Sequence, residues 1–292
     1  MKKRSIYEHS SIKQHLLQHY ENYLPLLEAE VEREYVKTRF GTTHVLQLGK
    51  KGGQPLFIFH GANCINPMTL SWFKPLFNEY HIYAPDLIGH PGYSVEGRLG
   101  TKDGSFASWA NDLLDHYHIQ KTAFAGVSYG GGIALKTAAA YPEKAVCTML
   151  VVPAGIVPFS KWWTARTMMM PYLLYQLNDA AKQRQAITDA LSSGCMRDID
   201  EDIMSTILQH VSIEYHLPDG ITRQKLKHYQ APTLVIAGDD DVFFPSHLLF
   251  KKAVQLLGDR LEWHAYRMGH FPSEYFLEEI NRSMASFLKK HY

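Results

Sequence analysis

Long apolar runs are absent from this chain of 292 residues. No stretch approaches the ~18 consecutive apolar residues that a membrane-spanning helix needs. Although residues 1–4 are basic, residues 5–11 contain no apolar segment of the kind that forms the core of a secretion signal. We therefore expect a cytoplasmic protein with no membrane partner.

Cysteine is also scarce, with three residues in the whole chain. A small, odd number favours reduced, buried thiols over a disulfide framework. Cys64 follows His60 closely, and we interpret it as a packed thiol near the functional site rather than as a second nucleophile. His116 and His118 have a spacing that suits a metal, but no further His or Cys nearby completes a tetrahedral set. We therefore expect neither a metal nor another cofactor.

Neither sign of charge dominates, because 30 Lys and Arg residues balance 29 Asp and Glu residues. The formal net charge is +1, whereas a nucleic-acid-binding domain usually carries a strong excess of positive charge. This balance argues against a nucleic-acid or acidic-polymer partner. A small molecule is the expected partner, and the pattern leaves the oligomeric state open.

The most informative pattern lies at residues 126–130, which read GVSYG and fit G-x-S-x-G. An apolar strand at residues 122–125 leads into it, and an Ala-rich helical run at residues 133–141 leads away. The turn between such a strand and helix is so tight that the positions two before and two after the serine have no room for a side chain. Because the turn also exposes the hydroxyl, Ser128 is the predicted nucleophile.

A serine hydroxyl needs a carboxylate-oriented histidine to take its proton, and with this pattern both partners follow downstream. A short apolar strand at residues 233–237 ends in a glycine and leads to Asp239, Asp240 and Asp241. Only one of the three can reach an imidazole, and the position in the turn favours Asp241 as the acid. Asp86 precedes the nucleophile in the chain and is not the candidate.

The base is expected after the last strand, at residues 261–268. His270 follows a glycine in the loop beyond this strand, which favours it as the base. His264 lies within the strand and would point to a face of the sheet, while His60 and His90 come before the nucleophile. We interpret His90 as structural.

An anion site for the tetrahedral intermediate is predicted after the strand at residues 55–59, which runs into a turn at residues 60–63. The backbone N–H groups of Ala62 and of Tyr129, which follows the nucleophile, are the candidate oxyanion hole. Asn63, next in the turn, is a candidate substrate-binding residue.

Strands alternate with helices along most of the chain, which indicates an α/β fold with a mostly parallel eight-stranded sheet covered by helices on both faces. The expected strands are residues 34–40, 44–48, 55–59, 81–84, 122–125, 145–152, 233–237 and 261–268. Apolar residues at helical spacing also predict an N-terminal helical arm over residues 5–33.

Residues 159–230 interrupt this alternation with helical patterns at residues 162–177, 180–193 and 199–211. We interpret them as a helical cap inserted into a core made of residues 1–158 and 231–292. Trp162, Trp163 and Met169 are candidate substrate-binding residues in this cap. Packing between the cap helices explains the same residues at least as well.

These motifs resemble the serine branch of the α/β-hydrolase superfamily. The resemblance covers about residues 34–290 in family order and rests on His60-Gly61, residues 85–92 (PDLIGHPG), the G-x-S-x-G turn, residues 238–241 with Pro245, and Gly269-His270. More narrowly, residues 38–45 (TRFGTTHV), the HGA sequence at 60–62 and Trp72 look like bacterial carboxylesterases of the naproxen-esterase type. Family members commonly carry a polar residue before the nucleophile, whereas this chain has Val127.

The resemblance implies a serine hydrolase that cleaves small to medium, mainly apolar carboxylic esters through an acyl-enzyme. A carbon–carbon bond, lactone or amide hydrolase with the same triad is the nearest alternative. A hydrolase-fold ligand receptor or stress-signalling protein is an alternative of a different class.

Overall fold

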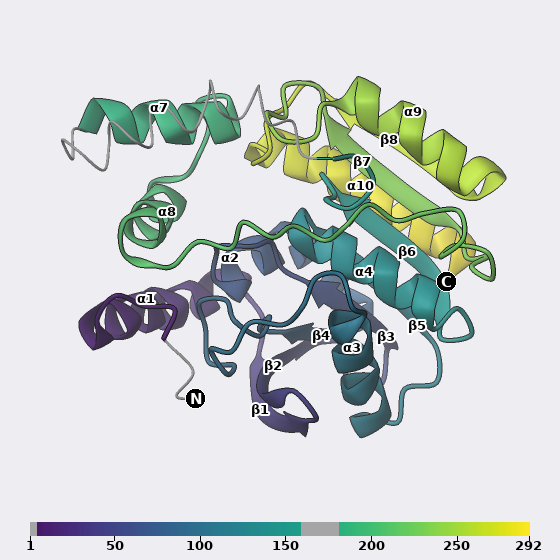
Figure 1. Ribbon diagram of the computed structural model, residues 1–292, viewed down its shortest axis with the longest axis horizontal. Coiled ribbons are helices and arrows are strands. Elements are labelled where there is room, and N and C mark those ends of the chain that lie inside the picture. Colours follow the sequence, from purple (N-terminus) through teal and green to yellow (C-terminus); the bar gives the residue numbers. More distant parts are fainter. Residues whose placement is uncertain (1–4, 159–180) are drawn as a thin grey trace.

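The computed structural model describes residues 5–158 and 181–292. Within these residues the chain forms one eight-stranded sheet of order β1-β2-β4-β3-β5-β6-β7-β8 (Figure 1). The strands are β1 (Val31–Thr38), β2 (Gly41–Gly49), β3 (Gln54–Phe59), β4 (Tyr80–Pro85), β5 (Thr122–Val127), β6 (Ala145–Val151), β7 (Thr233–Gly238) and β8 (Leu261–Tyr266). β1 pairs with β2 and β2 with β4 in antiparallel fashion, while all later pairs are parallel. The predicted α/β class and the eight predicted strands are confirmed, but the first strand spans residues 31–38 rather than the expected 34–40.

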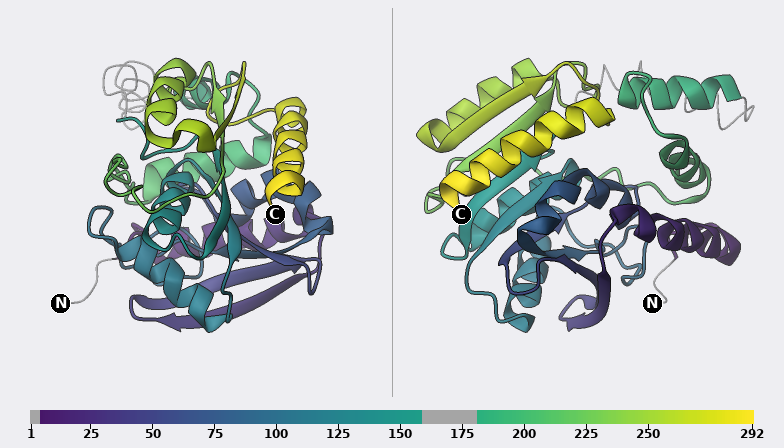
Figure 2. Two further views of the ribbon diagram at one scale, coloured as in Figure 1. Left: turned by 90° about the vertical axis from the view of Figure 1, so that its right-hand side faces the viewer. Right: turned by 180° about the vertical axis from the view of Figure 1, so that it is seen from behind.

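Helices cover both faces of the sheet because its central strands are apolar on both sides. Along β3, Leu56 and Ile58 belong to one core cluster, while Phe57 and Phe59 belong to the other. The second cluster includes residues of α3 (Ser105–His116), α4 (Tyr129–Ala140) and α9 (Ser246–Leu257), and the first includes residues of α2 (Asn66–Leu70), η2 (Ser71–Asn78) and α10 (Glu274–His291). Figure 2 shows α10 crossing the face opposite to the one that α3 and α4 cover in Figure 1.

The N-terminal segment is helical where the spacing predicted it, in α1 (Ser10–Tyr23) and the 3-10 helix η1 (Leu24–Leu27). The expected end of this arm at residue 33 is too late, because β1 already begins at Val31. Pairing with β2 decides this boundary, since Val31 lies opposite Leu48. Just before α1 in the chain, Tyr7 forms an antiparallel β-bridge with Val211. The N-terminal segment therefore also contacts the chain that directly follows residue 210.

Two helices occupy the described part of the predicted cap. These are α7 (Ala181–Ser192) and α8 (Asp198–His210), which coincide with two of the helical patterns, and α8 lies beside α1 (Figures 1 and 2). Residues 162–177, with Trp162, Trp163 and Met169, lie outside the described residues. After a short 3-10 helix η4 (Gly258–Arg260), the core closes with β8 and α10. No helix in residues 5–158 or 181–292 is long and apolar enough to span a membrane.

Candidate active site

Ser128 occupies a strained turn between β5 and α4. Its backbone angles are φ 51° and ψ −115°, a region that a residue with a side chain rarely adopts. The neighbouring strand β6 and the segment after it hold this conformation, because the Ser128 N–H donates to Val151 O at 2.9 Å and the Ser128 carbonyl accepts from Ala154 N at 2.9 Å. The hydroxyl makes no capping hydrogen bond to α4 and is therefore not committed to the helix.

Glycine is required on both sides of this turn by close backbone contacts. A Cβ at Gly126 would overlap the backbone of Gly130, and a Cβ at Gly130 would overlap the carbonyl oxygens of Phe59 and His60. Neighbouring backbone cannot move aside as a flexible side chain can. The G-x-S-x-G pattern thus reflects close packing within the turn at Gly126 and against the end of β3 at Gly130.

His270 and Asp241 form a buried pair next to this turn. His270 Nδ1 lies 2.9 Å from Asp241 Oδ2, and the Asp241 and His270 side chains are 0% and 7% exposed. The other carboxylate oxygen, Oδ1, accepts the N–H groups of Phe243 at 2.8 Å and Phe244 at 3.2 Å. The carboxylate is therefore held in place from both oxygens, and it holds the imidazole in turn.

The two neighbouring carboxylates are placed differently. Asp239 and Asp240 are exposed, whereas Asp241 is buried. Asp239 accepts a hydrogen bond from the Ser246 hydroxyl instead. Of the three adjacent aspartates, only Asp241 is hydrogen-bonded to His270 in the described structure.

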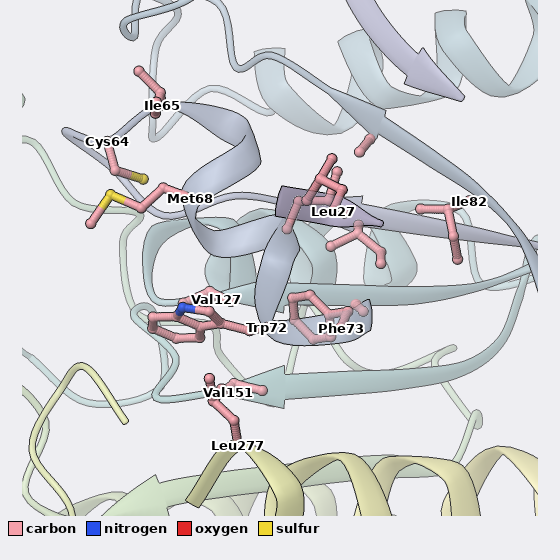
Figure 3. Close-up of a cluster of buried hydrophobic side chains, with 14 of the residues drawn as sticks. Leu27, Cys64, Ile65, Met68, Trp72, Phe73, Ile82, Val127, Val151 and Leu277 are labelled. Carbon is pink, nitrogen blue, oxygen red and sulfur yellow. The ribbon is translucent and has the colours of Figure 1, made fainter. Parts of the chain in front are cut away.

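Ser128 and His270 line the same pocket, which has a volume of about 320 Å³. Ala62 and Asn63 from the turn after β3 also line it. Most of the remaining wall is apolar and comes from segments far apart in the sequence: Trp72, Val127, Leu191, Met204, Leu208, Ile213, Leu217, Phe243, Phe244 and Phe271. Trp72 on η2 and Val127 at the end of β5, both labelled in Figure 3, belong to one buried apolar cluster. Such an apolar cavity with a few polar groups is typical of a small-molecule site.

The predicted oxyanion donors come from two different turns, one after β3 and one between β5 and α4. Tyr129 is the first residue of α4, and N–H groups in the first turn of a helix have no partner within the helix. Its ring packs away from the pocket, 5.1 Å from the ring of His90 and 5.7 Å from that of Phe106. Ala62 follows β3 and is partly exposed at the pocket.

A model of the alpha/beta hydrolase family matches residues 56–281. The chain belongs to this family. It is 24% identical over 280 residues to carboxylesterase YbfK of Bacillus subtilis (strain 168). This alignment covers 93% of this chain and 92% of the relative. It is also 24% identical over 250 residues to the uncharacterized carboxylesterase nap of the same organism, covering 83% of this chain and 81% of the relative.

The fold comparison agrees with the family. The crystal structure of naproxen esterase from Bacillus subtilis has a TM-score of 0.80 and 22% sequence identity, and the match covers 94% of this chain and 96% of that one. The predicted alpha/beta hydrolase fold and its likeness to carboxylesterases of the naproxen-esterase type are therefore confirmed.

Two other histidines near this candidate site, His60 and His90, are buried. The two ring nitrogens of His60 lie 2.7 Å from Gly61 O and 2.8 Å from Leu87 N, so one donates and the other accepts. Burial lowers the pKa of His60 to about 4. His90 Nδ1 accepts the N–H of Asn63 at 3.3 Å, and burial also lowers its pKa well below the usual value. These contacts give His60 and His90 structural roles at the edge of the site.

Asn63 lines the pocket, but its side-chain amide is bound to protein. Its Oδ1 accepts the N–H of Glu214 at 2.8 Å, and its Nδ2 donates to the Glu214 carbonyl at 3.2 Å. The expectation that Asn63 binds substrate does not anticipate this second use of the side chain. Cys64 is buried beside it and donates to Gly61 O at 3.1 Å, and burial raises the pKa of the thiol to about 12. A thiol in this state is a poor nucleophile.

The sequence pattern does not identify Glu214, which lines the pocket, or Arg98, which pairs with it. The Glu214 carboxylate is 4% exposed, lies 3.5 Å from Arg98 Nε, and accepts the N–H of His216 at 2.7 Å. Arg98 also donates to the carbonyls of Ser212 and Ile213. No motif surrounds either residue, and only the packing of a loop after β4 against the chain beyond α8 brings them together.

Proposed function

We propose that this alpha/beta hydrolase cleaves small to medium, mainly apolar carboxylic esters through an acyl-enzyme on Ser128. The observation that carries the proposal is the convergence of Ser128 and the Asp241-supported imidazole of His270 on one apolar pocket. The names of the carboxylesterase relatives support the same activity.

In the proposed mechanism, Ser128 Oγ attacks the ester carbonyl carbon while His270 takes its proton. Because Nδ1 of His270 is hydrogen-bonded to Asp241, Nε2 is the nitrogen left to accept it. Asp241 stabilises the imidazolium, and the N–H groups of Ala62 and Tyr129 bind the oxyanion. The protonated imidazole then delivers its proton to the leaving alcohol. Water attacks the acyl-enzyme in the second half of the reaction, with His270 again as the base.

The pocket supports the proposed substrate class. A volume of about 320 Å³ lies at the small end of the range for ligand pockets and accommodates a short or branched acyl group. Its wall contains the aromatic and aliphatic side chains of Phe243, Phe271, Met204 and Leu208. Burial of an apolar acyl group against them contributes about 25 cal/mol for each Å² removed from water.

We further propose that residues 159–230 act as the cap of this site, with residues 1–158 and 231–292 as the core. Support comes from the described part of the segment, since α8 and the chain beyond it supply Leu208 and Leu217 to the pocket wall. Trp162, Trp163 and Met169 stay proposed contacts of the substrate. The three cysteines, Cys64, Cys147 and Cys195, are free, which supports the proposal of a cytoplasmic enzyme.

The decisive experiment combines active-site labelling with turnover. A fluorophosphonate probe should label the protein once, on the peptide that contains Ser128, and Ser128→Ala should lower kcat for p-nitrophenyl esters by about 10⁴–10⁶-fold. Ser246→Ala is the control, because this serine binds Asp239 outside the pocket, and it should retain near-normal turnover. Labelling elsewhere would contradict the proposal, and one slow turnover followed by retention of the ligand would indicate a receptor instead.

A further inference from the structure

A group of three potential metal ligands lies outside the hydrolase site, between the N-terminal arm and the proposed cap. His15 and His19 lie one turn apart on α1, and Asp202 lies on α8. His15 Nε2 is 3.1 Å from His19 Nε2, and His19 Nε2 is 3.3 Å from Asp202 Oδ2. All three ligand atoms lie within 4.8 Å of one another, and this is the one such group among the described residues.

The two separations that involve His19 Nε2, 3.1 Å and 3.3 Å, fit the edges of a tetrahedral metal site. With zinc–nitrogen and zinc–oxygen bonds of about 2.0–2.1 Å, adjacent ligand atoms in a tetrahedron lie about 3.3 Å apart. We propose that His15, His19 and Asp202 bind a divalent transition-metal ion of the zinc class, which links α1 to α8. Three protein ligands leave the fourth position of the tetrahedron open to water.

The donor set selects the kind of ion. Two imidazoles and one carboxylate suit Zn²⁺, Co²⁺ and Ni²⁺, whereas Mg²⁺ and Ca²⁺ prefer oxygen ligands throughout. An imidazole must be unprotonated to bind a metal.

A buried polar cluster beside the proposed site already holds the two helices together. Tyr23, one turn beyond His19 on α1, donates its hydroxyl to Asp200 Oδ1 at 2.8 Å. Arg197 Nε donates to the other oxygen of the same carboxylate at 2.8 Å. These contacts between α1 and α8 hold the proposed ligands of the two helices next to each other.

A bound ion would connect the arm to the pocket through α8. This helix carries Met204 and Leu208, which line the pocket that contains Ser128. The ion would clamp one pocket wall to α1, from a site that is itself accessible to solvent, since His15 and Asp202 are exposed.

The test uses the full-length protein without a histidine tag, after removal of metals with a chelator. Calorimetric titration with Zn²⁺ should show one site per chain, and Co²⁺ should give the visible absorption of a tetrahedral ion. His19→Ala and Asp202→Asn should each weaken Zn²⁺ binding by at least about tenfold. Removing a direct ligand lowers metal affinity by at least as much as removing a group that hydrogen-bonds to a ligand. His116→Ala is the control, because His116 also faces one carboxylate, Glu34 at 2.7 Å, and it should leave binding unchanged.

Thermal unfolding supplies a second readout that does not depend on ester turnover. Zn²⁺ should raise the Tm of the wild type and of His116→Ala but not that of His19→Ala. Equal Tm values for all variants in chelator would show that the substitutions leave the fold intact. If His19→Ala and Asp202→Asn bind Zn²⁺ as tightly as the wild type, or if the wild type binds none, the three side chains form only a histidine contact and an ion pair, and the proposal is wrong.

Discussion

Asn63 and Glu214 exchange two hydrogen bonds, one from the Glu214 N–H to the Asn63 carbonyl oxygen at 2.8 Å and one from the Asn63 amide to the Glu214 carbonyl at 3.2 Å. The pair ties the turn that carries the proposed oxyanion donor Ala62 to the segment that forms the far wall of the pocket. Asn63 itself has a φ of 52°, a conformation that asparagine tolerates better than most residues. The geometry of the oxyanion turn is thus coupled to the pocket wall.

Removing this side chain without straining the turn should loosen the wall. Asn63→Gly keeps the positive φ and deletes both hydrogen bonds, so we expect a loss of about 1–3 kcal/mol in the free energy of unfolding and a rise in KM for esters that fill the pocket. Asn63→Asp keeps the acceptor but places a carboxylate oxygen against the Glu214 carbonyl, so its loss of stability should be at least as large as that of Asn63→Gly. Denaturant titration and steady-state kinetics measure both effects; unchanged stability and KM in Asn63→Gly would show that the two bonds contribute nothing.

Only one of the three adjacent aspartates, Asp241, should be needed for catalysis. Asp241→Asn should lower kcat by about 10³–10⁴-fold, because the imidazole loses the charge that orients and stabilises it. Asp240→Asn is the matched control and should cost less than about tenfold, since Asp240 is exposed. Kinetics on one p-nitrophenyl ester suffice. A larger loss of kcat in Asp240→Asn than in Asp241→Asn would show that Asp240 is the carboxylate that supports His270.

Gly130, two positions after the nucleophile, should not accept even a methyl group. In Gly130→Ala the new Cβ would meet backbone oxygens of β3 and its following turn, so we expect more than about 3 kcal/mol of destabilisation or no folded protein. Gly220→Ala is the control, because no atom lies within 4 Å of the added Cβ. Its Tm and activity should stay close to the wild type. A stable, active Gly130→Ala enzyme would mean that the turn is packed less tightly than the structure shows.

Acid should destabilise the fold through its buried histidines. The pKa of His60 is lowered by burial to about 4, below the unfolded value of about 6.5, so between these pH values the unfolded state binds more protons. Stability should therefore fall as the pH drops from 6.5 toward 4, by up to about 1.4 kcal/mol per pH unit from this group, and it should not change above pH 6.5 on its account. His90 contributes with the same sign.

His60→Gln checks this assignment through the slope of stability against pH. The variant loses hydrogen bonds to Gly61 and Leu87 and should be less stable at pH 7, but its stability should depend less on pH between 4 and 6.5. Urea unfolding at half-unit pH intervals gives both slopes. If the free energy of unfolding depends on pH equally in both proteins, a group other than His60 causes the loss of stability in acid.

Local chemistry in the sequence decided much of this protein. Apolar runs such as residues 122–127 predict buried parallel strands because they leave no polar face for water. The turn at Ser128 can also be predicted from the sequence. Contacts within a few residues of the serine, and with the strand beside it, require glycine at Gly126 and Gly130. The order of Ser128, Asp241 and His270 along the chain follows from the family pattern.

Tertiary packing alone decided what surrounds these residues. The hydrogen bonds between Asn63 and Glu214, and the approach of His15 and His19 to Asp202, join segments that no local pattern relates. Propensity and periodicity act over a few residues, whereas these contacts depend on how α8 and the chain beyond it pack on the arm and the sheet. The first strand shows the same limit at small scale, because its start at Val31 is decided by its partner on β2 and not by its own residues.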